Sequence, residues 1–429
     1  MFLKEIHIQN FKGFDDLRFS FTQENGEPRK HTILLGENGT GKSNLLKAIA
    51  LGLARPSELI EIFKNPAEWI SLGKKNCKIT TITSACTLVL EWNINDSVLD
   101  VVEKYKHNNH VFYEEHIKNK EDNGVVFPLY GYGAFRKFNY FNELGLEFNQ
   151  RNKASARFAN LFDADHSLYP ITKWLIDLDY NSNDARTKEM FQFVQQKLNT
   201  CLNNISFYKI QKADRTLWFK EGDKELPLSS LSDGYQNMAA FIVDLLYKWS
   251  KTFTWNSTSN QDSFEHLFNK ASKGLILIDE LDLHLHPKWQ RQLLAFFAEQ
   301  LPHFQIIATT HSPLTAQQAG EGELFTLKKD AQGKVEILPF RGSADKMLVG
   351  DLLTSKDAFG LSSSESFKVE NLKSRYLFLK ERGERNAEEE QEWQNLKETL
   401  QAIPNDKGSA YYSQQHYQLL LEIKAELHK

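Results

Sequence analysis

The sequence predicts an α/β fold that is built around a mixed sheet and opens with an antiparallel hairpin. Three patterns support this prediction. Residues 31–53 contain a short apolar run, a glycine cluster and then apolar residues at helical spacing. Residues 274–278 and 305–308 are apolar runs of buried-strand length, and a helical stretch at 289–301 separates them. Strands that alternate with helices in this way are expected to lie parallel in one sheet.

Length and charge restrict the class of protein. The chain has 429 residues, which excludes peptide hormones, knottins and single-module adaptors. Its 52 lysines and arginines are balanced by 56 aspartates and glutamates, which leaves a net charge of −4. The whole molecule is therefore not a polycation that coats nucleic acid, and any such contact must be local. An aromatic content of 12% argues against a disordered chain.

Cysteine usage and the N-terminus indicate a compartment. Cys77, Cys86 and Cys201 lie far apart and form no CxxC pair, so neither a disulfide framework nor a cysteine zinc site is indicated. The first residues lack a cleavable signal pattern, and the longest apolar runs are too short to span a bilayer. We therefore expect a soluble protein of the cytoplasm that does not act in a membrane.

The first elements along the chain are β-strands. Apolar and polar residues alternate through Phe2–Phe21, which predicts two strands joined at Gly13. After the strand, glycine loop and helix of residues 31–53, the β pattern returns over Lys78–Trp92. The charged stretch that follows, as far as Gly124, is expected to be a surface excursion.

We expect four regions along the chain. Residues 1–95 and 228–340 form the two halves of one α/β body, and residues 96–227 form an inserted, largely helical lobe. An amphipathic helix is predicted over Asp233–Trp249. The remaining residues, 341–429, are expected to be a C-terminal helical segment that ends in a hairpin. The apolar stripes of that hairpin are Trp393, Leu396 and Leu400 on its first helix and Tyr417, Leu420, Ile423 and Leu427 on its second.

A phosphate loop joins the strand and the helix of residues 31–53. The pattern G-x-x-x-x-G-K-[ST] is matched between a predicted strand and a predicted helix, which is the context that a phosphate loop requires. Glycines allow backbone N–H groups to form an anion nest, the lysine reaches the outer phosphates, and the hydroxyl is suited to Mg²⁺. The residues predicted to bind the phosphates of a nucleotide such as ATP are Gly36, Glu37, Asn38, Gly39, Thr40, Gly41, Lys42 and Ser43.

Two carboxylates follow the apolar run at 274–278. Asp279 and Glu280 are expected at the carboxyl edge of the sheet, where open α/β sheets bind ligands. Asp279, together with Ser43, is the predicted ligand of Mg²⁺, and Glu280 is the predicted catalytic residue that polarises an attacking water. A strand that ends in solvated acids is the simpler interpretation of this motif taken alone.

A histidine ends the next buried strand. His311 follows the apolar run at 305–308, and should lie at the same sheet edge as Asp279. We predict that it is a second catalytic residue, which senses the γ-phosphate or orients water. A lone histidine is more often structural or exposed to solvent.

A Ser-x-Gly turn precedes the helix at 233–249. Ser232 and Gly234 are placed to present a hydroxyl and backbone N–H groups at the positive end of that helix, with Asp233 between them. Taken alone, this turn is a good helix cap and nothing more.

In the order phosphate loop, Ser-x-Gly turn, Asp-Glu strand and histidine strand, the sequence resembles ABC-type ATPases of the branch that includes RecF, Rad50, SMC and OLD proteins. The stretch Ile8–Phe14 also resembles the first strand and turn of that branch. The resemblance implies a P-loop ATPase head that binds ATP and Mg²⁺ and forms a homodimer around ATP, with higher oligomers left open. It implies Walker A at Gly36–Ser43, Walker B at Leu275–Glu280, a D-loop near Leu285–Pro287, a switch His311, and a signature whose Ser232, Asp233 and Gly234 complete the site in trans.

The sequence departs from that branch in two places. Asp233 stands where many members have glycine. No glutamine is evident for the Q-loop, because the candidate segment Tyr130–Arg136 contains none. Arg136 is left with two interpretations, a contact with phosphate or the partner subunit, or a solvated arginine after an aromatic strand.

Within the branch, the stretch Phe359–Leu361 and the charged helices after it resemble PtuA-like ATPases of Septu and retron-linked antiphage systems. This resemblance implies an ATPase that senses a phage or nucleic-acid cue and controls a separate effector nuclease of HNH type. A DNA-repair ATPase of RecF type is the alternative. A transporter ATPase is disfavoured by the missing glutamine and by the lack of a membrane-coupling segment.

Two further motifs leave alternatives open. Basic and aromatic residues alternate between 136 and 158, which is compatible with contact to DNA or RNA, although a solvated face is favoured. They are Arg136, Lys137, Arg151, Lys153 and Arg157 with Phe138, Tyr140, Phe148 and Phe158. His284 and His286 suggest a metal site, but no cysteine or third histidine is near in sequence, so a D-loop position is favoured.

Overall fold

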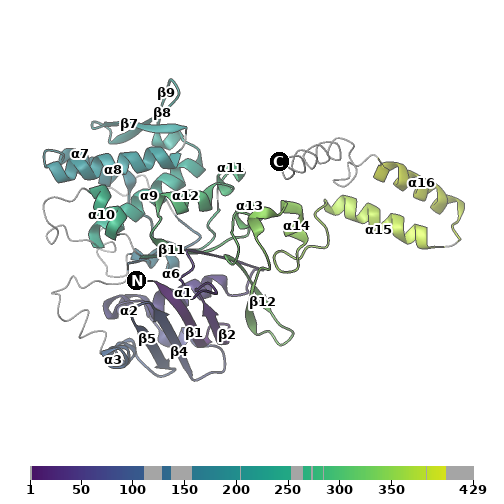
Figure 1. The fold of residues 1–429 in the computed structure, drawn as a ribbon, viewed down its shortest axis with the longest axis horizontal. Coiled ribbons are helices and arrows are strands. Elements are labelled where there is room, and N and C mark those ends of the chain that lie inside the picture. The colour runs from purple at the N-terminus through teal and green to yellow at the C-terminus, as the bar shows by residue number, and fades with distance from the viewer. Residues whose placement is uncertain are drawn as a thin grey trace, which may run out of the picture. The chain divides into compact units, whose positions relative to one another are not determined.

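A computed structural model shows the fold (Figure 1) and describes residues 2–110, 128–136, 157–202, 204–252, 264–271, 274–283, 285–382 and 384–401. The chain divides into two compact units, Met1–Gly360 and Leu361–Lys429. Predictions for His284, for most of the basic and aromatic residues between 136 and 158, and for the second helix of the terminal hairpin lie outside the described residues. Within the described part, none of the helices combines the length and the apolar character needed to cross a bilayer.

A four-stranded antiparallel sheet begins the first unit, in the order β2-β1-β4-β5. The predicted N-terminal hairpin and the predicted β pattern near Lys78–Trp92 are both confirmed. Alternation explains the sheet, since Ile6, Ile8, Leu17 and Phe19 are buried on one face. The strands are β1 (Leu3–Phe11), β2 (Phe14–Ser20), β4 (Asn76–Thr83) and β5 (Thr87–Asn93).

A six-stranded mixed sheet forms the centre of the unit, in the order β13-β12-β3-β11-β10-β6. All neighbouring pairs are parallel except β12 and β13, which are antiparallel. This confirms the predicted mixed α/β sheet and the parallel pairing of the two buried strands. The strands are β3 (His31–Gly36), β6 (Leu129–Tyr132), β10 (Gly274–Ile278), β11 (Phe304–Thr309), β12 (Leu324–Lys329) and β13 (Val335–Pro339).

The central sheet is buried on both faces. On β10, Leu275 and Leu277 point into one core, while Ile276 and Ile278 point into the other. The first core holds α1 (Lys42–Gly52), which contacts both sheets. The second core includes side chains of α8 (Ala185–Leu202), α9 (Asp233–Thr252) and α12 (Leu293–Gln300).

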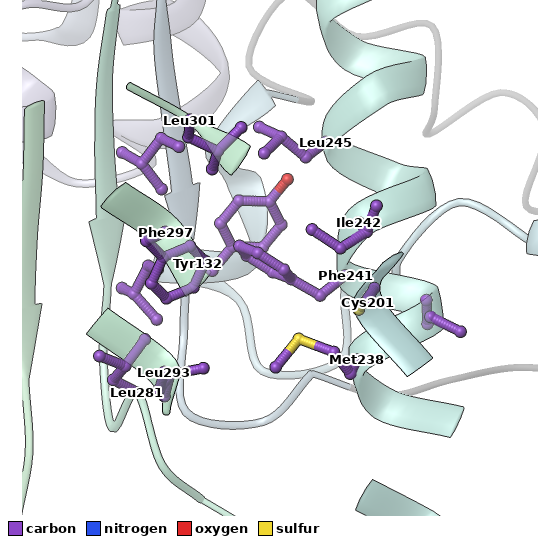
Figure 2. Packing of buried hydrophobic residues seen from close by; sticks show 14 of the residues in the cluster. Tyr132, Cys201, Met238, Phe241, Ile242, Leu245, Leu281, Leu293, Phe297 and Leu301 are labelled. Atoms are coloured by element: carbon purple, nitrogen blue, oxygen red, sulfur yellow. The ribbon is translucent and has the colours of Figure 1, made fainter. Parts of the chain in front are cut away.

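The second core brings aromatic rings from separate elements together (Figure 2). The ring of Phe241, on α9, lies 4.7 Å from the ring of Tyr132 and 5.9 Å from that of Phe297, measured between centroids. Both pairs meet edge to face, which is a favourable geometry for aromatic pairs. Tyr132 ends β6, so this packing joins α9 to the edge of the central sheet.

Residues 96–227 differ from the predicted helical lobe. The segment contributes β6 to the central sheet, and it carries a three-stranded antiparallel sheet beside its helices. Part of the expected surface excursion is α3 (Val98–Asn108), whose Val101 and Tyr105 are buried. The other elements are α6 (Ala159–Phe162), α7 (Ile171–Tyr180), β7 (Ile205–Gln211), β8 (Thr216–Glu221) and β9 (Lys224–Pro227).

The predicted helix at 289–301 is split in two, α11 (Pro287–Gln290) and α12. The first unit also extends to Gly360, beyond the expected border at residue 340. Side chains of the core explain this, because Thr326 donates a hydrogen bond to the carbonyl of Asp357 and Gln317 donates one to that of Met347. The remaining helices are α2 (Pro56–Ile62), α10 (Phe264–Ala271), α13 (Pro313–Ala316) and α14 (Val349–Thr354), with short 3-10 helices at Pro66–Trp69, Leu228–Ser230 and Ala344–Lys346.

The second unit contains α15 (Phe367–Glu381) and α16 (Ala387–Gln401), which pack against each other. The ring of Trp393 stacks on Tyr376 with centroids 5.9 Å apart, and Leu379 and Leu396 are buried. The predicted stripe that includes Trp393 and Leu396 therefore faces α15, a pairing that the sequence patterns did not predict.

Candidate nucleotide site

The phosphate loop turns sharply between β3 and α1. Gly36, Gly39 and Gly41 have φ values of 149°, 78° and 99°, which side-chain-bearing residues rarely adopt. A Cβ atom on Gly36 would lie 2.7 Å from the carbonyl oxygen of Leu327 on β12. The loop therefore needs glycine for its conformation and, at Gly36, also for space.

Lys42 lies over this loop. Its ammonium donates hydrogen bonds to the carbonyl of Gly36 at 2.6 Å and to that of Glu37 at 3.1 Å, and the residue is only 7% exposed. Burial lowers the pKa of Lys42, while the charges of Asp279 and Glu280 act in the opposite direction. A buried cation is thus placed between the loop and two carboxylates.

The acidic turn, Asp279 and Glu280, follows β10. The N–H of Asp279 donates to the carbonyl of Tyr132 at 2.8 Å, and that of Glu280 donates to the hydroxyl of Thr309 at 2.7 Å. Glu280 has a φ of 48°, in the left-handed region. Asp279 is buried and accepts a hydrogen bond from Thr309 at 2.6 Å. Neither carboxylate is therefore simply a solvated strand end.

Arg136 holds the same turn from the side of β6. Its guanidinium donates to the carbonyl of Asp279 at 3.1 Å and to the carbonyl of Glu280 at 2.9 Å. The interpretation of a solvated arginine is therefore wrong, because the bonds to these carbonyls draw the side chain inward. Sequence reasoning missed this contact, since a bond to backbone carbonyls leaves no pattern of residue types.

His311 follows β11 and a buried Thr310. Its side chain is exposed and interacts electrostatically with Asp282, whose carboxylate accepts a hydrogen bond from Thr310. Burial raises the pKa of Asp282. Because β3, β6, β10 and β11 run parallel, their carboxyl ends bring the phosphate loop, Arg136, the acidic turn and His311 to one edge of the sheet.

The signature turn precedes α9. Ser232 and Asp233 are exposed, and the amide of Gln236 closes the turn by donating to the carbonyl of Leu231 at 2.5 Å. The helix begins at Asp233, so Gly234 lies in its first turn. An exposed hydroxyl and free N–H groups at a helix N-terminus can bind an anion supplied by a second chain.

These residues fit a nucleoside triphosphate with Mg²⁺. The three positive-φ glycines bend the loop so that it can cradle phosphate, and the ammonium of Lys42 is already buried beside it. Asp279 supplies an oxygen ligand of the kind that Mg²⁺ prefers, and Ser43 supplies a hydroxyl at the start of α1.

The described members of the predicted basic and aromatic group have internal partners. Arg157 donates from Nε to one carboxylate oxygen of Glu58 at 2.6 Å and from a terminal nitrogen to the other at 2.9 Å. Glu58 is fully buried and also bonds Arg55. For Arg136 and Arg157, both the nucleic-acid interpretation and the solvated-face interpretation are therefore wrong, because each side chain neutralises or orders buried groups.

His286 has a local structural contact. It precedes α11 and its Nδ1 accepts the N–H of Lys288 at 3.2 Å, as a helix cap does. His284, the other half of the metal alternative, lies outside the described residues.

Two family models match the chain. One, described as “AAA domain, putative AbiEii toxin, Type IV TA system”, covers residues 97–316, which include the signature turn, the acidic turn and His311. The other, described as “AAA ATPase domain”, covers residues 1–125, which include the phosphate loop.

Relatives in defence systems confirm the resemblance to PtuA-like ATPases. The Septu protein PtuA of Bacillus mycoides (strain KBAB4) is 26% identical over 400 residues, 93% of this chain and 50% of that protein. The chain thus spans half the length of this relative. The retron Vc95 probable ATPase of Vibrio cholerae serotype O1 biovar El Tor is 24% identical, over 73% of this chain and 70% of that protein. PtuA of Bacillus thuringiensis is also 24% identical, over 78% of each chain.

Solved structures of SMC heads also align with the chain. The SMC head domain from Thermotoga maritima has a TM-score of 0.38 and 15% identity, over 80% of this chain and 100% of that chain. An SMC head bound to the C-terminal winged-helix domain of ScpA has a TM-score of 0.45 and 12% identity, over 79% of this chain and 98% of that chain.

Proposed function

The chain belongs to the family described as “AAA domain, putative AbiEii toxin, Type IV TA system”, and from this premise we propose that it hydrolyses ATP to control a separate nuclease in antiphage defence. One observation carries the ATPase part. The buried ammonium of Lys42 and the carboxylates of Asp279 and Glu280 come from two strand ends at one sheet edge, and their charges act on one another. A cation that binds phosphate and a carboxylate that polarises water are what phosphoryl transfer requires of a protein.

Each residue has a role in this proposal. The N–H groups of Gly39, Gly41 and Lys42 and the ammonium of Lys42 bind the phosphates of ATP. Ser43 and Asp279 would hold Mg²⁺, which supplies neutralising charge to the phosphates. Glu280 accepts a proton from the attacking water, and His311 orients that water or the γ-phosphate.

We propose that two chains form the working unit. Ser232, Asp233 and Gly234 are exposed or partly exposed at the start of α9, so one chain can offer them to ATP that is bound on another. The hydroxyl and the helix N-terminus would then contact the γ-phosphate from the far side. ATP would thus join two heads into a homodimer, and pairs of dimers would form any higher oligomer.

The defence role rests on the relatives. PtuA is a protein of Septu, and another relative is named a retron ATPase. By likeness to them we propose a cytoplasmic ATPase that acts with an HNH nuclease encoded beside it, and that a phage or nucleic-acid cue sets its activity. The RecF-like alternative has less support, because Arg136 and Arg157 serve internal contacts instead of a basic groove.

The test uses the purified chain and the nuclease gene that adjoins its own. We expect Mg²⁺-dependent release of phosphate from ATP, lost in Lys42→Ala together with ATP binding, because the point charge on the outer phosphates is gone. We also expect the nuclease to co-purify with the wild type. Tight ATP binding by Lys42→Ala would refute the site, and phage infection that is unaffected by deleting either gene would refute the defence role.

A further inference from the structure

Arg136 is half-buried and contacts the backbone of the acidic turn. Its planar guanidinium bonds two successive backbone carbonyls, those of Asp279 and Glu280, at 3.1 and 2.9 Å. Arginine is suited to this because its donors form a rigid fork, whereas lysine offers only a point charge. The contact therefore constrains the path of the backbone through the acidic turn.

That path needs a constraint. Glu280 has a φ of 48°, in the left-handed region that residues with a side chain rarely adopt. Thr309 holds the turn on one side, by accepting the N–H of Glu280. Arg136 holds it on the other side, so the direction in which the Glu280 side chain leaves the backbone depends on both contacts.

Electrostatics makes Arg136 hard to replace. Burial lowers the pKa of Arg136, and the charges of Asp282, Asp279 and Glu280 act in the opposite direction, so that the resulting pKa is about 10. The guanidinium is thus charged at neutral pH, and its charge offsets three carboxylates that would otherwise repel one another. Lys42 provides the corresponding charge on the side of the phosphate loop.

We propose that Arg136 is a positioning residue for ATP hydrolysis, which aims the Glu280 carboxylate by holding the backbone of the acidic turn. It takes no part in binding ATP and does not touch the reacting atoms. This inference rests on the proposed ATPase function. It assigns a role to a residue that stands in a segment where the ABC resemblance leads one to expect glutamine.

The choice of variant follows from the surroundings of the side chain. Arg136 lines a small cavity with Asn237 and Met238 of α9, so truncation to alanine would also disturb the start of the signature helix. Arg136→Lys keeps the charge and most of the volume but cannot bond both carbonyls as a fork. Arg136→Gln keeps hydrogen-bonding capacity without charge and serves as the second variant.

Arg157 offers a matched control. It is a buried arginine in the same unit, and it forms a forked ion pair with Glu58, which is a structural contact. Arg157→Lys should therefore lower the melting temperature while leaving kcat near that of the wild type.

The experiment compares kcat, KM for ATP, affinity for a non-hydrolysable ATP analogue, and melting temperature in the wild type and these variants. We expect Arg136→Lys to lower kcat about 10- to 100-fold, because a misdirected carboxylate is costly to catalysis. Arg136→Gln should lower it at least as far. Analogue affinity should stay within about threefold of the wild type in both variants, because the phosphate loop is intact.

Three results would overturn the inference. The first is an unchanged kcat in Arg136→Lys. The second is a loss of kcat in Arg136→Lys that is matched by an equal loss of affinity for the ATP analogue. The third is the same loss of kcat in Arg157→Lys when the two variants have the same melting temperature. No turnover by the wild type would instead refute the proposed ATPase function, and the inference with it.

Discussion

The hydroxyl of Thr309 donates a hydrogen bond to Oδ1 of Asp279 over 2.6 Å, and so ties the end of β11 to the acidic turn after β10. The hydroxyl oxygen of Thr309 in turn accepts a hydrogen bond from the N–H of Glu280 at 2.7 Å. One hydroxyl thus orients the predicted Mg²⁺ ligand and fixes the backbone of the predicted catalytic residue. Buried polar networks of this kind constrain geometry because every unmade bond is costly.

Removing that hydroxyl should impair turnover more than binding. Thr309→Val keeps the shape of the side chain, and we expect kcat to fall about tenfold while affinity for an ATP analogue changes little. Thr326→Val is the control, because Thr326 is buried in β12 of the same sheet and its hydroxyl bonds Asp357 instead. Steady-state kinetics and analogue titration measure both effects. An equal loss of kcat in the two variants would contradict a specific role for Thr309.

Glu280→Gln should separate binding from hydrolysis. The substitution leaves the phosphate loop and Lys42 in place and removes the carboxylate that accepts a proton from water, so ATP should still bind while phosphate release slows about 10²- to 10⁴-fold. Single-turnover assays with labelled ATP measure the chemical step directly. Full hydrolysis by this variant would mean that another group, such as His311, acts as the base.

We propose that each ATP site is formed by two chains, so two inactive variants should complement each other when they are mixed. Lys42→Ala removes the phosphate charge from one chain, and Ser232→Arg fills the signature turn of another, so each homodimer should be inactive. A mixed dimer contains one intact site, formed by Lys42 of one chain and Ser232 of the other, and should recover part of the ATPase activity. Subunit exchange is checked with two affinity tags. Zero activity after confirmed exchange would argue against the signature assignment or the dimer.

The sequence predicted most of the elements that position this site, because their patterns are local. Alternation revealed β1 and β2, and the phosphate loop was recognisable between its strand and helix. An aromatic strand before Arg136 was one interpretation of the sequence, but its place in the central sheet as β6 was not predicted, since the four residues Leu129–Tyr132 are all buried and show no alternation. Its pairing with β10 depends on contacts across 146 positions of sequence.

The hydrogen bonds that hold the acidic turn in place could not be predicted from the sequence either. Arg136 and Thr309 act on backbone atoms or on one oxygen of a distant residue, so no spacing along the chain announces them. The pairing of α15 with α16 was also missed. The apolar side chains of α15 point to all sides of the helix and include the exposed Phe367 and Phe378, so no single apolar stripe indicated its packed face.

Glu58 should make the free energy of unfolding depend on pH in the acid range. Burial alone would raise its pKa, but the guanidinium groups of Arg157 and Arg55 lower it below the usual 4.5. The folded carboxylate therefore binds its proton at lower pH than the unfolded one does, so its contribution is complete above about pH 4.5 and is lost as the pH falls through the folded pKa. We expect Glu58→Gln to cost about 3–5 kcal/mol at pH 7 and to weaken this acid dependence.

Urea unfolding from pH 7 to pH 3 measures the effect. Glu225→Gln is the control, because the pair of Glu225 with Lys209 is exposed and such pairs contribute little. A Glu58→Gln variant that matches the wild type in stability at pH 7 would show that the buried ion pair contributes no net stability.

The second unit should be dispensable for ATP turnover but needed for recruitment. A cut at Asn386 would separate α16 from α15 and expose the buried Leu379, so the clean truncation ends at Gly360, the last residue of the first unit. All described residues of the nucleotide site lie before that point. We expect the truncated chain to hydrolyse ATP at the wild-type rate and to lose co-purification of the nuclease or higher assembly.

The full-length double variant Phe367→Ser and Phe378→Ser should also weaken recruitment, because these rings are 77% and 55% exposed and can bury apolar area on a partner. Loss of ATP binding on truncation would show that the second unit supports the head, and unchanged co-purification and assembly would remove it as a partner surface.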